Sequence, residues 1–504
     1  MTTSIVKKNI AANFSGSIWQ ALMVLIFIPI YIKFMGIESW ALVGIFATLQ
    51  AIFGQLDMGL SGTLTREMAR LSVEPSKGQE MRNLVRTLEV IYWGIAVLVG
   101  ITVVSLSPLI ANHWVKAGQI PLKTIEQALL IMGFVMALQM PIGFYSGGLI
   151  GLQKQVLLNV INVSISTLRG VGAILILWLI SPTIQAFFLW QIVVSAINLF
   201  LLMFFLWSSL PISQKRAVFQ KQLLKGIWKF AVGMSANSIL SVILIQMDKV
   251  VLSKMLSLEI FGYYILASTV AMSLGRFFTP IFISIYPRFT QLVHLDDQDS
   301  LKQLYHKSCQ FMSVLILPAA IVVSLFSYEI LFLWTQDIAI AEKSYLLLSI
   351  LICGTAINGI TQLPYALQLA FSWTSLSVYT NMISVILLIP VLIYMTTLYG
   401  AIGGASLWLI YNMICVFIAI PIMHRRILCK EKWRWYWQDV GIPLVAGLSL
   451  ASFGRFLLNS PMSQLLTLQY LTIISVLTLF ITVIATPLTR TWLFQQLLKL
   501  KLIS

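Results

Sequence analysis

Long apolar stretches, separated by short polar connections, dominate the chain. Residues 170–214, 344–424 and 456–489 contain no Asp, Glu, Lys or Arg, and the second stretch has room for three helices joined by very short turns. A helix needs about 20 predominantly apolar residues to cross a bilayer. The pattern predicts about fourteen membrane-spanning helices, at residues 15–34, 41–60, 88–110, 128–150, 156–180, 183–207, 228–252, 259–285, 310–334, 344–370, 375–398, 401–423, 438–458 and 465–487.

Composition supports this prediction and excludes several classes of protein. Of the 504 residues, 59% are apolar and only 10% are Asp, Glu, Lys or Arg. A soluble domain carries about 25% of these charged residues, because its surface must be hydrated. A soluble enzyme, a disordered chain and a fibrous protein are therefore excluded, and we predict an all-α integral membrane protein.

The positive charges predict the orientation of the chain. There are 33 Lys and Arg residues against 17 Asp and Glu, a net charge of +16. If the N-terminus is inside, 24 of the cations lie in cytoplasmic segments and seven lie outside. Cytoplasmic loops are enriched in Lys and Arg, so we predict that both termini are cytoplasmic. Topology thus accounts for most of the charge, and no nucleic-acid partner is expected; attraction for an anionic substrate could account for the rest.

The chain also repeats itself weakly. Several motifs recur in order at offsets of 218 to 223 residues: Lys33 and Glu38 as Lys254 and Glu259, Gln139-x-Pro141 as Gln362-x-Pro364, and Leu189-Trp190 as Leu407-Trp408. A repeat of six helices places both copies in the same orientation, as two parallel bundles related by a pseudo-two-fold axis along the membrane normal. The predicted parts are an N-terminal lobe (1–208), a basic cytoplasmic linker (209–227), a C-terminal lobe (228–427), and two additional helices with a tail (428–504).

Two parallel six-helix bundles are typical of a transporter that binds its substrate between the bundles and works by alternating access. Charges within spans are expensive and mark candidate sites. Arg169 and Arg276 lie within predicted spans. The planar guanidinium group matches phosphate oxygens in pairs, so these two residues could hold a diphosphate. Each could instead pair with a structural acid or with backbone carbonyl groups.

Three further charged residues belong to the candidate set. Asp248 and Lys249 are adjacent in the predicted span 228–252 and would point about 100° apart, which does not favour an ideal pair. Lys249 could extend toward the interface, while Asp248 could bind a coupling proton or cation, or neutralise an arginine. Asp57 lies near the cytoplasmic end of the second span, where it could form a salt bridge with Arg66 or Arg70.

Uncharged polar residues and several absences narrow the function. Amide side chains are frequent in the spans, including Gln50, Gln139, Asn358, Gln362 and Asn412. Singly they hold helices together, and together they predict a wet cavity. The chain has no GxxxxGK[ST] motif, no His or Cys set with metal-ligand spacing, and short outer loops. We therefore expect no enzyme activity, no cofactor and no metal site.

Three segments resemble a known family: residues 56–71, 246–268 and 285–292. They are similar to bacterial polysaccharide (O-antigen) flippases of the multidrug/oligosaccharidyl-lipid/polysaccharide (MOP) exporter superfamily. The resemblance covers roughly residues 5–430, and two extra helices are also typical of polysaccharide transporters.

The resemblance implies a V-shaped, two-lobed flippase in the bacterial inner membrane. Its substrate would be an undecaprenyl-diphosphate-linked O-antigen or polysaccharide repeat unit, moved from the cytoplasmic to the periplasmic leaflet during lipopolysaccharide or polysaccharide biosynthesis. It implies membrane lipid and other polysaccharide-assembly membrane proteins as partners, and coupling to H+ or Na+. The implied sites are a cavity with Arg169, Arg276, Lys249 and Asp248, and a cytoplasmic gate motif with Asp57, Arg66, Arg70 and Arg288.

Two alternatives remain open. A multidrug or cation antiporter of the same superfamily would favour acids in the cavity, and the spans offer only Asp57, Glu89, Asp248 and Glu329, mostly near span ends. A membrane glycosyltransferase or polymerase would need a larger set of charged groups in outer loops than this chain has. The sign of the charge in the cavity discriminates between the flippase and the antiporter.

Overall fold

The computed structural model of the protein is built of helices. It describes residues 2–57, 59–72, 74–213, 215–458, 463–491 and 495, without the side chains of residues 2–7, 10, 11, 14, 75 and 223–238. Among these residues, 13 helical segments are long and apolar enough to cross a membrane, which confirms the prediction of an all-α membrane protein. Helices satisfy every backbone polar group internally, as a bilayer requires. The remaining predicted span, 228–252, falls within the long helix α8, and the count of fourteen stays a prediction.

The chain divides into two compact units, Met1–Gly262 and Tyr263–Ser504. The first unit contains α1 (Thr2–Met35), α2 (Ile37–Phe53), η1 (Gly54–Asp57), α3 (Leu60–Leu71), η2 (Pro75–Lys77), α4 (Gly78–Leu109), η3 (Ile110–Trp114), α5 (Leu122–Gly151), α6 (Gln155–Leu179), α7 (Ile184–Ser209) and α8 (Lys221–Met255). Helix α8 therefore packs with the first unit, although the sequence repeat assigns it to the second lobe. The lobe boundaries at 208 and 228 follow the repeat and stay a prediction.

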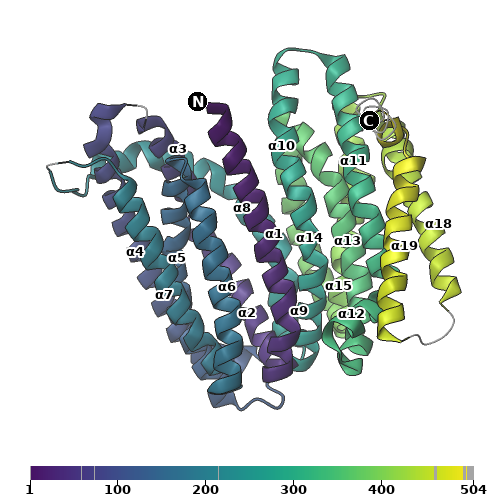
Figure 1. Ribbon diagram of the computed structural model, residues 1–504, viewed down its shortest axis with the longest axis horizontal. Helices are drawn as coiled ribbons and strands as arrows, with labels where there is room; N and C mark the ends of the chain where they lie inside the picture. Colours follow the sequence, from purple (N-terminus) through teal and green to yellow (C-terminus); the bar gives the residue numbers. More distant parts are fainter. Residues whose placement is uncertain are drawn as a thin grey trace, which may run out of the picture. The chain divides into compact units, whose positions relative to one another are not determined.

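Within the first unit, α5 packs against both α4 and α7, and α1 packs against α6 (Figure 1). Buried aromatic residues fill the centre, with Tyr92 of α4 beside Phe144 and Tyr145 of α5. Helix α3 lies directly on α5, because Gly147 has no side chain there and its carbonyl oxygen accepts a hydrogen bond of 2.9 Å from Thr65. This close approach fixes the start of α3, which carries candidate residues.

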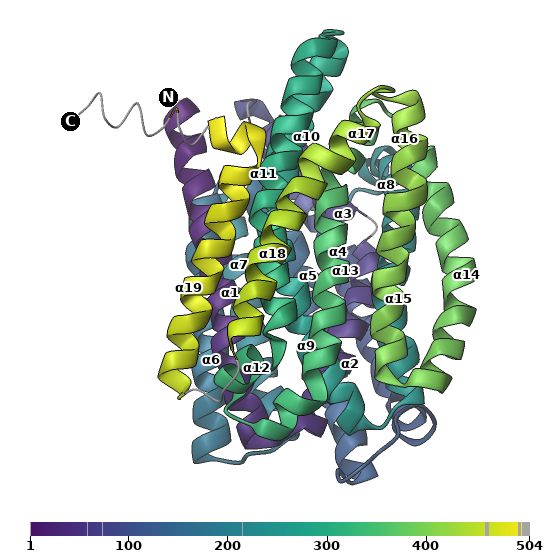
Figure 2. The same ribbon diagram turned by 90° about the vertical axis from the view of Figure 1, so that its right-hand side faces the viewer.

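The second unit begins inside α9. Its helices are α9 (Leu258–Ser273), α10 (Gly275–His294), α11 (Gln298–Leu325), α12 (Ser327–Thr335), α13 (Ile338–Ala370), α14 (Ser375–Tyr399), α15 (Ala401–Ile414), η4 (Cys415–Ala419), α16 (Ile420–Arg426), α17 (Lys432–Arg434), η5 (Trp435–Gly441), α18 (Ile442–Leu457) and α19 (Gln464–Ala485). The two C-terminal helices pack on α11 (Figure 2). Buried residues join them to the rest of the unit, including Leu317, Ile360, Ala451 and Ile474. The additional helices are thus an integral part of this unit.

The order of helices follows the predicted repeat. Helices α6 and α14 each have 25 residues and begin 220 positions apart. Lys33 lies in the last turn of α1 and Glu38 in the first turn of α2, just as Lys254 ends α8 and Glu259 begins α9. The repeated residues therefore mark the same kind of helix end.

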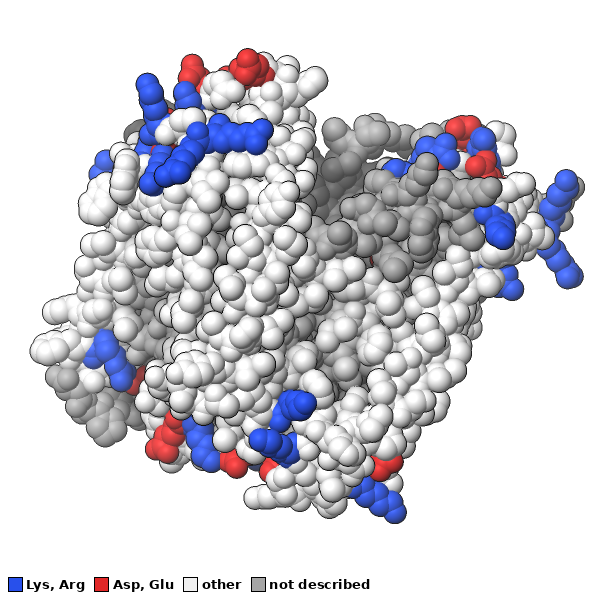
Figure 3. Space-filling model, turned by 180° about the vertical axis from the view of Figure 1, so that it is seen from behind, with Lys and Arg blue, Asp and Glu red and all other residues white. Residues whose placement is uncertain are grey.

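Charged side chains lie near the ends of the helices on the face drawn in Figure 3, and the surface between them is almost free of charge. Large apolar side chains are exposed along the membrane helices, among them Phe200 of α7 at 60% and Ile386 of α14 at 64%. An apolar belt of this kind is stable only against lipid. The protein is therefore a multi-pass membrane protein.

Candidate functional site

The second membrane helix of the first unit is broken near Asp57. Helix α2 ends at Phe53, the short 3-10 turn η1 follows, and α3 starts at Leu60. Gly59 makes the restart possible with a left-handed φ of 74°, which a residue with a side chain rarely adopts. The break places the Asp57 carboxylate inside the bundle.

Asp57 is held by hydroxyl and backbone donors. Its Oδ1 accepts hydrogen bonds from the Ser61 hydroxyl at 2.5 Å, from the Ser61 backbone N–H at 3.3 Å, and from the Tyr92 hydroxyl. The predicted alternative, a salt bridge from Asp57 to Arg66 or Arg70, is wrong. Both arginines pair instead with Glu67, each at 2.8 Å: Arg70 lies one turn after Glu67 on the same face of α3, and Arg66 is the neighbour of Glu67 in the chain.

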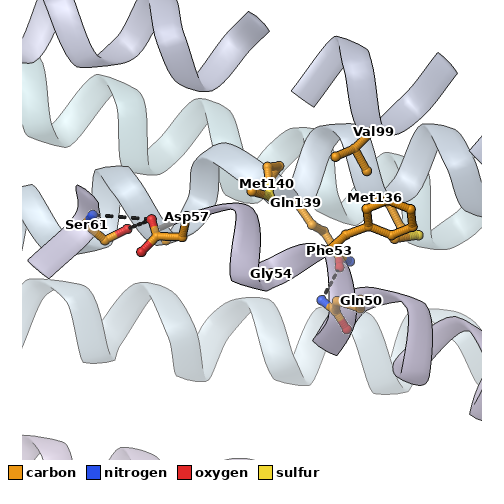
Figure 4. Close-up of a pocket in the computed structure, with 10 residues that line it drawn as sticks. Gln50, Phe53, Gly54, Asp57, Ser61, Val99, Met136, Gln139 and Met140 are labelled. Carbon is orange, nitrogen blue, oxygen red and sulfur yellow. Dashed lines mark hydrogen bonds between the residues drawn. The ribbon is translucent and has the colours of Figure 1, made fainter. Parts of the chain in front are cut away.

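Asp57 also lines a pocket of about 330 Å³ within the first unit (Figure 4). A chain of hydrogen bonds runs across its other end: Gln50 donates to Gln139 at 2.6 Å, and Gln139 donates to Ser195 at 3.0 Å. Met136 and Val99 complete the apolar wall. The pocket is thus partly polar, in agreement with the expectation from the amide residues.

The two candidate arginines have different surroundings. Arg169 on α6 is half-buried, interacts electrostatically with Tyr31 on α1, and has a buried Nε without a hydrogen-bond partner among the described residues. Arg276 lies in the first turn of α10, directly after the break between α9 and α10 at Leu274, and its side chain is exposed. Among the described residues, it forms no hydrogen bond or ion pair.

Asp248 and Lys249 contact each other, although neighbouring helical residues point about 100° apart and do not form an ideal pair. The Lys249 Nζ lies 3.4 Å from Asp248 Oδ1 and 3.1 Å from the backbone oxygen of Ile245. Both side chains are nearly buried, with 13% and 11% of their surfaces exposed. The lysine stem is long and flexible, so it folds back along the helix instead of extending to the interface.

The gate candidates lie at accessible positions. Arg66 and Arg70 are exposed on α3, and Arg288 is exposed on α10, where it donates to Gln291 at 2.9 Å. Arg66 and Arg70 share one acid, so α3 presents a net positive charge. Their role as a gate stays a prediction.

Sequence reasoning missed the partners of Asp57. Ser61 lies one helical turn after Asp57, but Tyr92 comes from α4; likewise Ser195, the partner of Gln139, comes from α7, far along the chain. The recurring Gln-x-Pro motif at Gln139 was the available indication, because a repeated amide in a span marks a polar contact. Nothing in the sequence pattern indicates that Tyr92 contacts Asp57.

Comparison with known proteins agrees with this architecture. A putative O-antigen transporter of Shigella flexneri is 21% identical over 402 residues, which are 80% of this chain and 93% of the relative. The lipid II flippase MurJ, in an inward closed conformation, aligns with a TM-score of 0.66 at 14% identity, covering 94% of this chain and 97% of MurJ. An inward-facing multidrug resistance MATE family transporter of the MOP superfamily aligns with a TM-score of 0.66 at 14% identity, covering 82% and 96%. These structural likenesses show a shared fold.

Two family models match the sequence. The MatE model matches residues 234–395, and the polysaccharide biosynthesis protein model matches residues 6–293, which is more than half of the chain. The expected resemblance to the MOP exporter superfamily is confirmed. The chain belongs to the polysaccharide biosynthesis protein family.

Proposed function

We propose that the protein is a flippase for an undecaprenyl-diphosphate-linked O-antigen or polysaccharide repeat unit. It would move the diphosphate–sugar head from the cytoplasmic to the periplasmic leaflet of the bacterial inner membrane, with both termini in the cytoplasm. The named relatives support this substrate class, since one is a putative O-antigen transporter and another is a lipid II flippase. No covalent bond changes in this process, so the protein needs only to provide a polar path through an apolar layer.

The observation that carries the proposal is the free charge of Arg276. A permanently charged group within a span is unfavourable unless it has a partner or water. Arg276 has neither an acid nor a hydrogen-bond acceptor among the described residues. It also follows a helix break, so the backbone N–H groups at the start of α10 add to its positive potential. A diphosphate would supply the missing anionic partner.

The acids in the spans support an anionic rather than a cationic substrate. Asp57 accepts from Ser61 and Tyr92, and Asp248 is paired with Lys249. The other two acids considered for cation binding are also engaged: Glu89 accepts from Arg86, Tyr145 and Trp207, and Glu329 pairs with Arg455. A carrier of cationic drugs needs a carboxylate available to its substrate. We therefore favour the flippase over the antiporter.

Alternating access requires a closure that can open, and one end of the first unit has such a contact. The Glu38 carboxylate accepts hydrogen bonds from the backbone N–H groups of Gln119, at 3.0 and 2.9 Å, and Ile120, at 3.1 Å. Gly118 lies so close to Glu38 that a side chain there would overlap the carboxylate. The loop that follows η3 is thereby held on the start of α2.

The same loop also holds the turn between α8 and α9. Lys116 and Ser257 form a parallel β-bridge, in which the Leu258 N–H donates to the Lys116 oxygen at 3.2 Å. The Lys116 Nζ donates to the Met255 oxygen at 2.7 Å. We call Glu38, Lys116, Gly118 and Ser257 the outer clasp, because the charge count predicts that this end faces outward. In the proposed cycle the clasp opens to release the head group.

Coupling to H+ or Na+ is part of the proposal. The Asp248–Lys249 pair is the candidate site, because a proton on Asp248 would release Lys249 from it. Arg169, next to Tyr31, would be a second phosphate contact.

The test is complementation of a bacterial strain that lacks its own O-antigen flippase and supplies a defined lipid-linked substrate. Arg276→Ala should lower surface polysaccharide at least about tenfold, the effect of losing one hydrogen bond to a charged group, while Arg276→Lys should retain part of the activity. Lys302→Ala is the matched control, because Lys302 lies outside the apolar part of α11. Normal polysaccharide with Arg276→Ala at equal membrane abundance would refute the assignment of Arg276.

A further inference from the structure

The connection between α16 and α18 carries a dense set of cations with exposed aromatic side chains. It joins two candidate membrane spans, Ala401–Arg426 and Lys432–Leu457. Five cations, Arg425, Arg426, Lys430, Lys432 and Arg434, lie within ten positions, with Glu431 as the single acid. Trp433 and Trp437 are 74% and 65% exposed. We call these seven cationic and aromatic residues the basic platform.

The platform is mounted on a buried polar cluster. His306 of α11 is fully buried, with Nδ1 2.5 Å from Asp439 Oδ2 and Nε2 3.0 Å from Glu431 Oε2. Gln310 donates to the other oxygen of Asp439 at 2.9 Å. Both ring nitrogens of His306 are thus within hydrogen-bond distance of a carboxylate. The cluster fixes the middle and the C-terminal end of the platform to α11.

These contacts draw the carboxylate of Glu431, the one acid in the segment, away from the outward face of the platform. Glu431 turns toward His306, and its side chain is only 18% exposed. Arg425, Arg426, Lys430 and Arg434 remain exposed, although Arg434 lies 3.7 Å from Glu431. The outward face therefore carries a clear excess of positive charge on a rigid support.

The aromatic residues indicate the depth at which the platform lies. Tryptophan prefers the headgroup region of a bilayer, where its ring is apolar and its N–H is wet. The Arg426 guanidinium lies over the Trp373 ring at 4.6 Å, and the Lys432 ammonium lies over the Trp433 ring at 4.9 Å. These contacts hold cations beside the aromatic rings, at the level where lipid phosphates are found.

We propose that the basic platform is a binding site for anionic phospholipid headgroups. The site would take the phosphate and its negative neighbour groups between the exposed arginines, with Trp433 and Trp437 inserted beside the glycerol backbones. The position between two span ends favours a lipid over a soluble acidic protein. The bound lipid would hold α18 and α19 in place on α11. This inference does not depend on which substrate is transported.

The experiment is a titration of the purified full-length protein with phosphatidylglycerol or phosphatidylcholine, followed by native mass spectrometry. The wild type should bind phosphatidylglycerol at least tenfold more tightly than phosphatidylcholine. The triple variant Arg425→Gln, Lys430→Gln, Arg434→Gln should lose at least tenfold of the affinity for phosphatidylglycerol, since each charge near an anionic lipid surface contributes about fivefold.

The matched control removes three exposed cations elsewhere, with Lys215→Gln, Arg216→Gln and Lys221→Gln, and should stay within twofold of the wild type. Circular dichroism checks that both triple variants keep their helices, as surface substitutions should. Equal losses in both variants would mean general electrostatic attraction and would overturn the site. Wild-type affinity in the platform variant would overturn it as well. Unchanged transport in that variant would leave the lipid site standing and concern only the flippase proposal.

Discussion

The two halves of the chain break their second membrane helix at matching places, and the two breaks carry opposite charges. The first break holds Asp57, and the second holds Arg276, 219 positions later. Asp57 accepts hydrogen bonds from Ser61 and Tyr92, whereas Arg276 has no partner among the described residues. Under the predicted duplication, the helix break is kept in both halves and the charged residue at the break differs. The charged group at the first break has hydrogen-bond partners within its own unit. The charged group at the second break has none among the described residues, so it can bind a ligand.

Each of the two units also has a row of hydrogen-bonded polar side chains within its spans. In the first unit, Gln50 donates to Gln139, which donates to Ser195. In the second, Gln362 donates to Asn358 at 3.1 Å, and Asn358 donates to Asn412 at 3.0 Å. Both chains link side chains of different helices, so each serves first to hold helices together.

The largest expected effect is a loss of stability when a carboxylate loses its partner, either Asp439 in the second unit or Asp57 in the first. His306→Leu should lower the free energy of unfolding by about 3–5 kcal/mol, because it leaves the charge of Asp439 buried without its partner. Tyr92→Phe, which removes one of the donors to Asp57, should lower it by about 1–3 kcal/mol. Both are measured by unfolding in mixed micelles. The double variant His306→Leu, Asp439→Leu should be more stable than His306→Leu alone, and an equal or lower stability would contradict this account.

The second prediction concerns the outer clasp, which the first half forms with Glu38. Gly118→Ala should displace the Glu38 carboxylate and cost about 1.5–3 kcal/mol, the contribution of a hydrogen bond to a charged group. Protection of the Gln119 and Ile120 amides against hydrogen exchange should fall with it. Gly94→Ala is the control, since a side chain at Gly94 meets open space, and it should raise helix stability by up to about 1 kcal/mol. Unchanged protection in Gly118→Ala would show that Glu38 does not hold the loop.

The third prediction separates the two breaks by function. Arg276→Gln should slow export about tenfold, or about 1.4 kcal/mol, with little change in stability, since Arg276 has no internal partner to lose. Asp57→Asn should have the opposite effect. It should lower the free energy of unfolding, and the protein that remains folded in the membrane should export at a near-normal rate. Export is measured as surface polysaccharide per copy of membrane protein. Equal effects on export would remove the distinction between a satisfied and an open break.

The smallest effects belong to the amide chains. Gln139→Leu and Gln362→Leu should each cost about 0.6 kcal/mol, the average for a hydrogen bond between membrane helices. If one of them abolishes export while stability stays near this value, that amide contacts substrate and is more than a contact between helices.

The membrane spans could be predicted because a bilayer imposes one length and one polarity on every crossing. The charged residues of the spans could be singled out for the same reason, since charge in an apolar layer is rare. Their partners could not be predicted. Tyr92 reaches Asp57 from another helix, and His306 meets Asp439 from 133 positions away, and both contacts depend on helix rotation and tilt. The Lys249 stem is long enough to turn back on Asp248, a contact that the 100° separation of neighbouring helical residues does not indicate.

The free guanidinium of Arg276 has a consequence for the resting carrier. A fixed positive charge that no group among the described residues neutralises must recruit water molecules or a mobile anion from solution. Hydration would then reach the middle of the second unit before any cargo arrives. The barrier that an arriving pyrophosphate meets is lowered in advance, and small anions such as chloride should compete for the empty carrier.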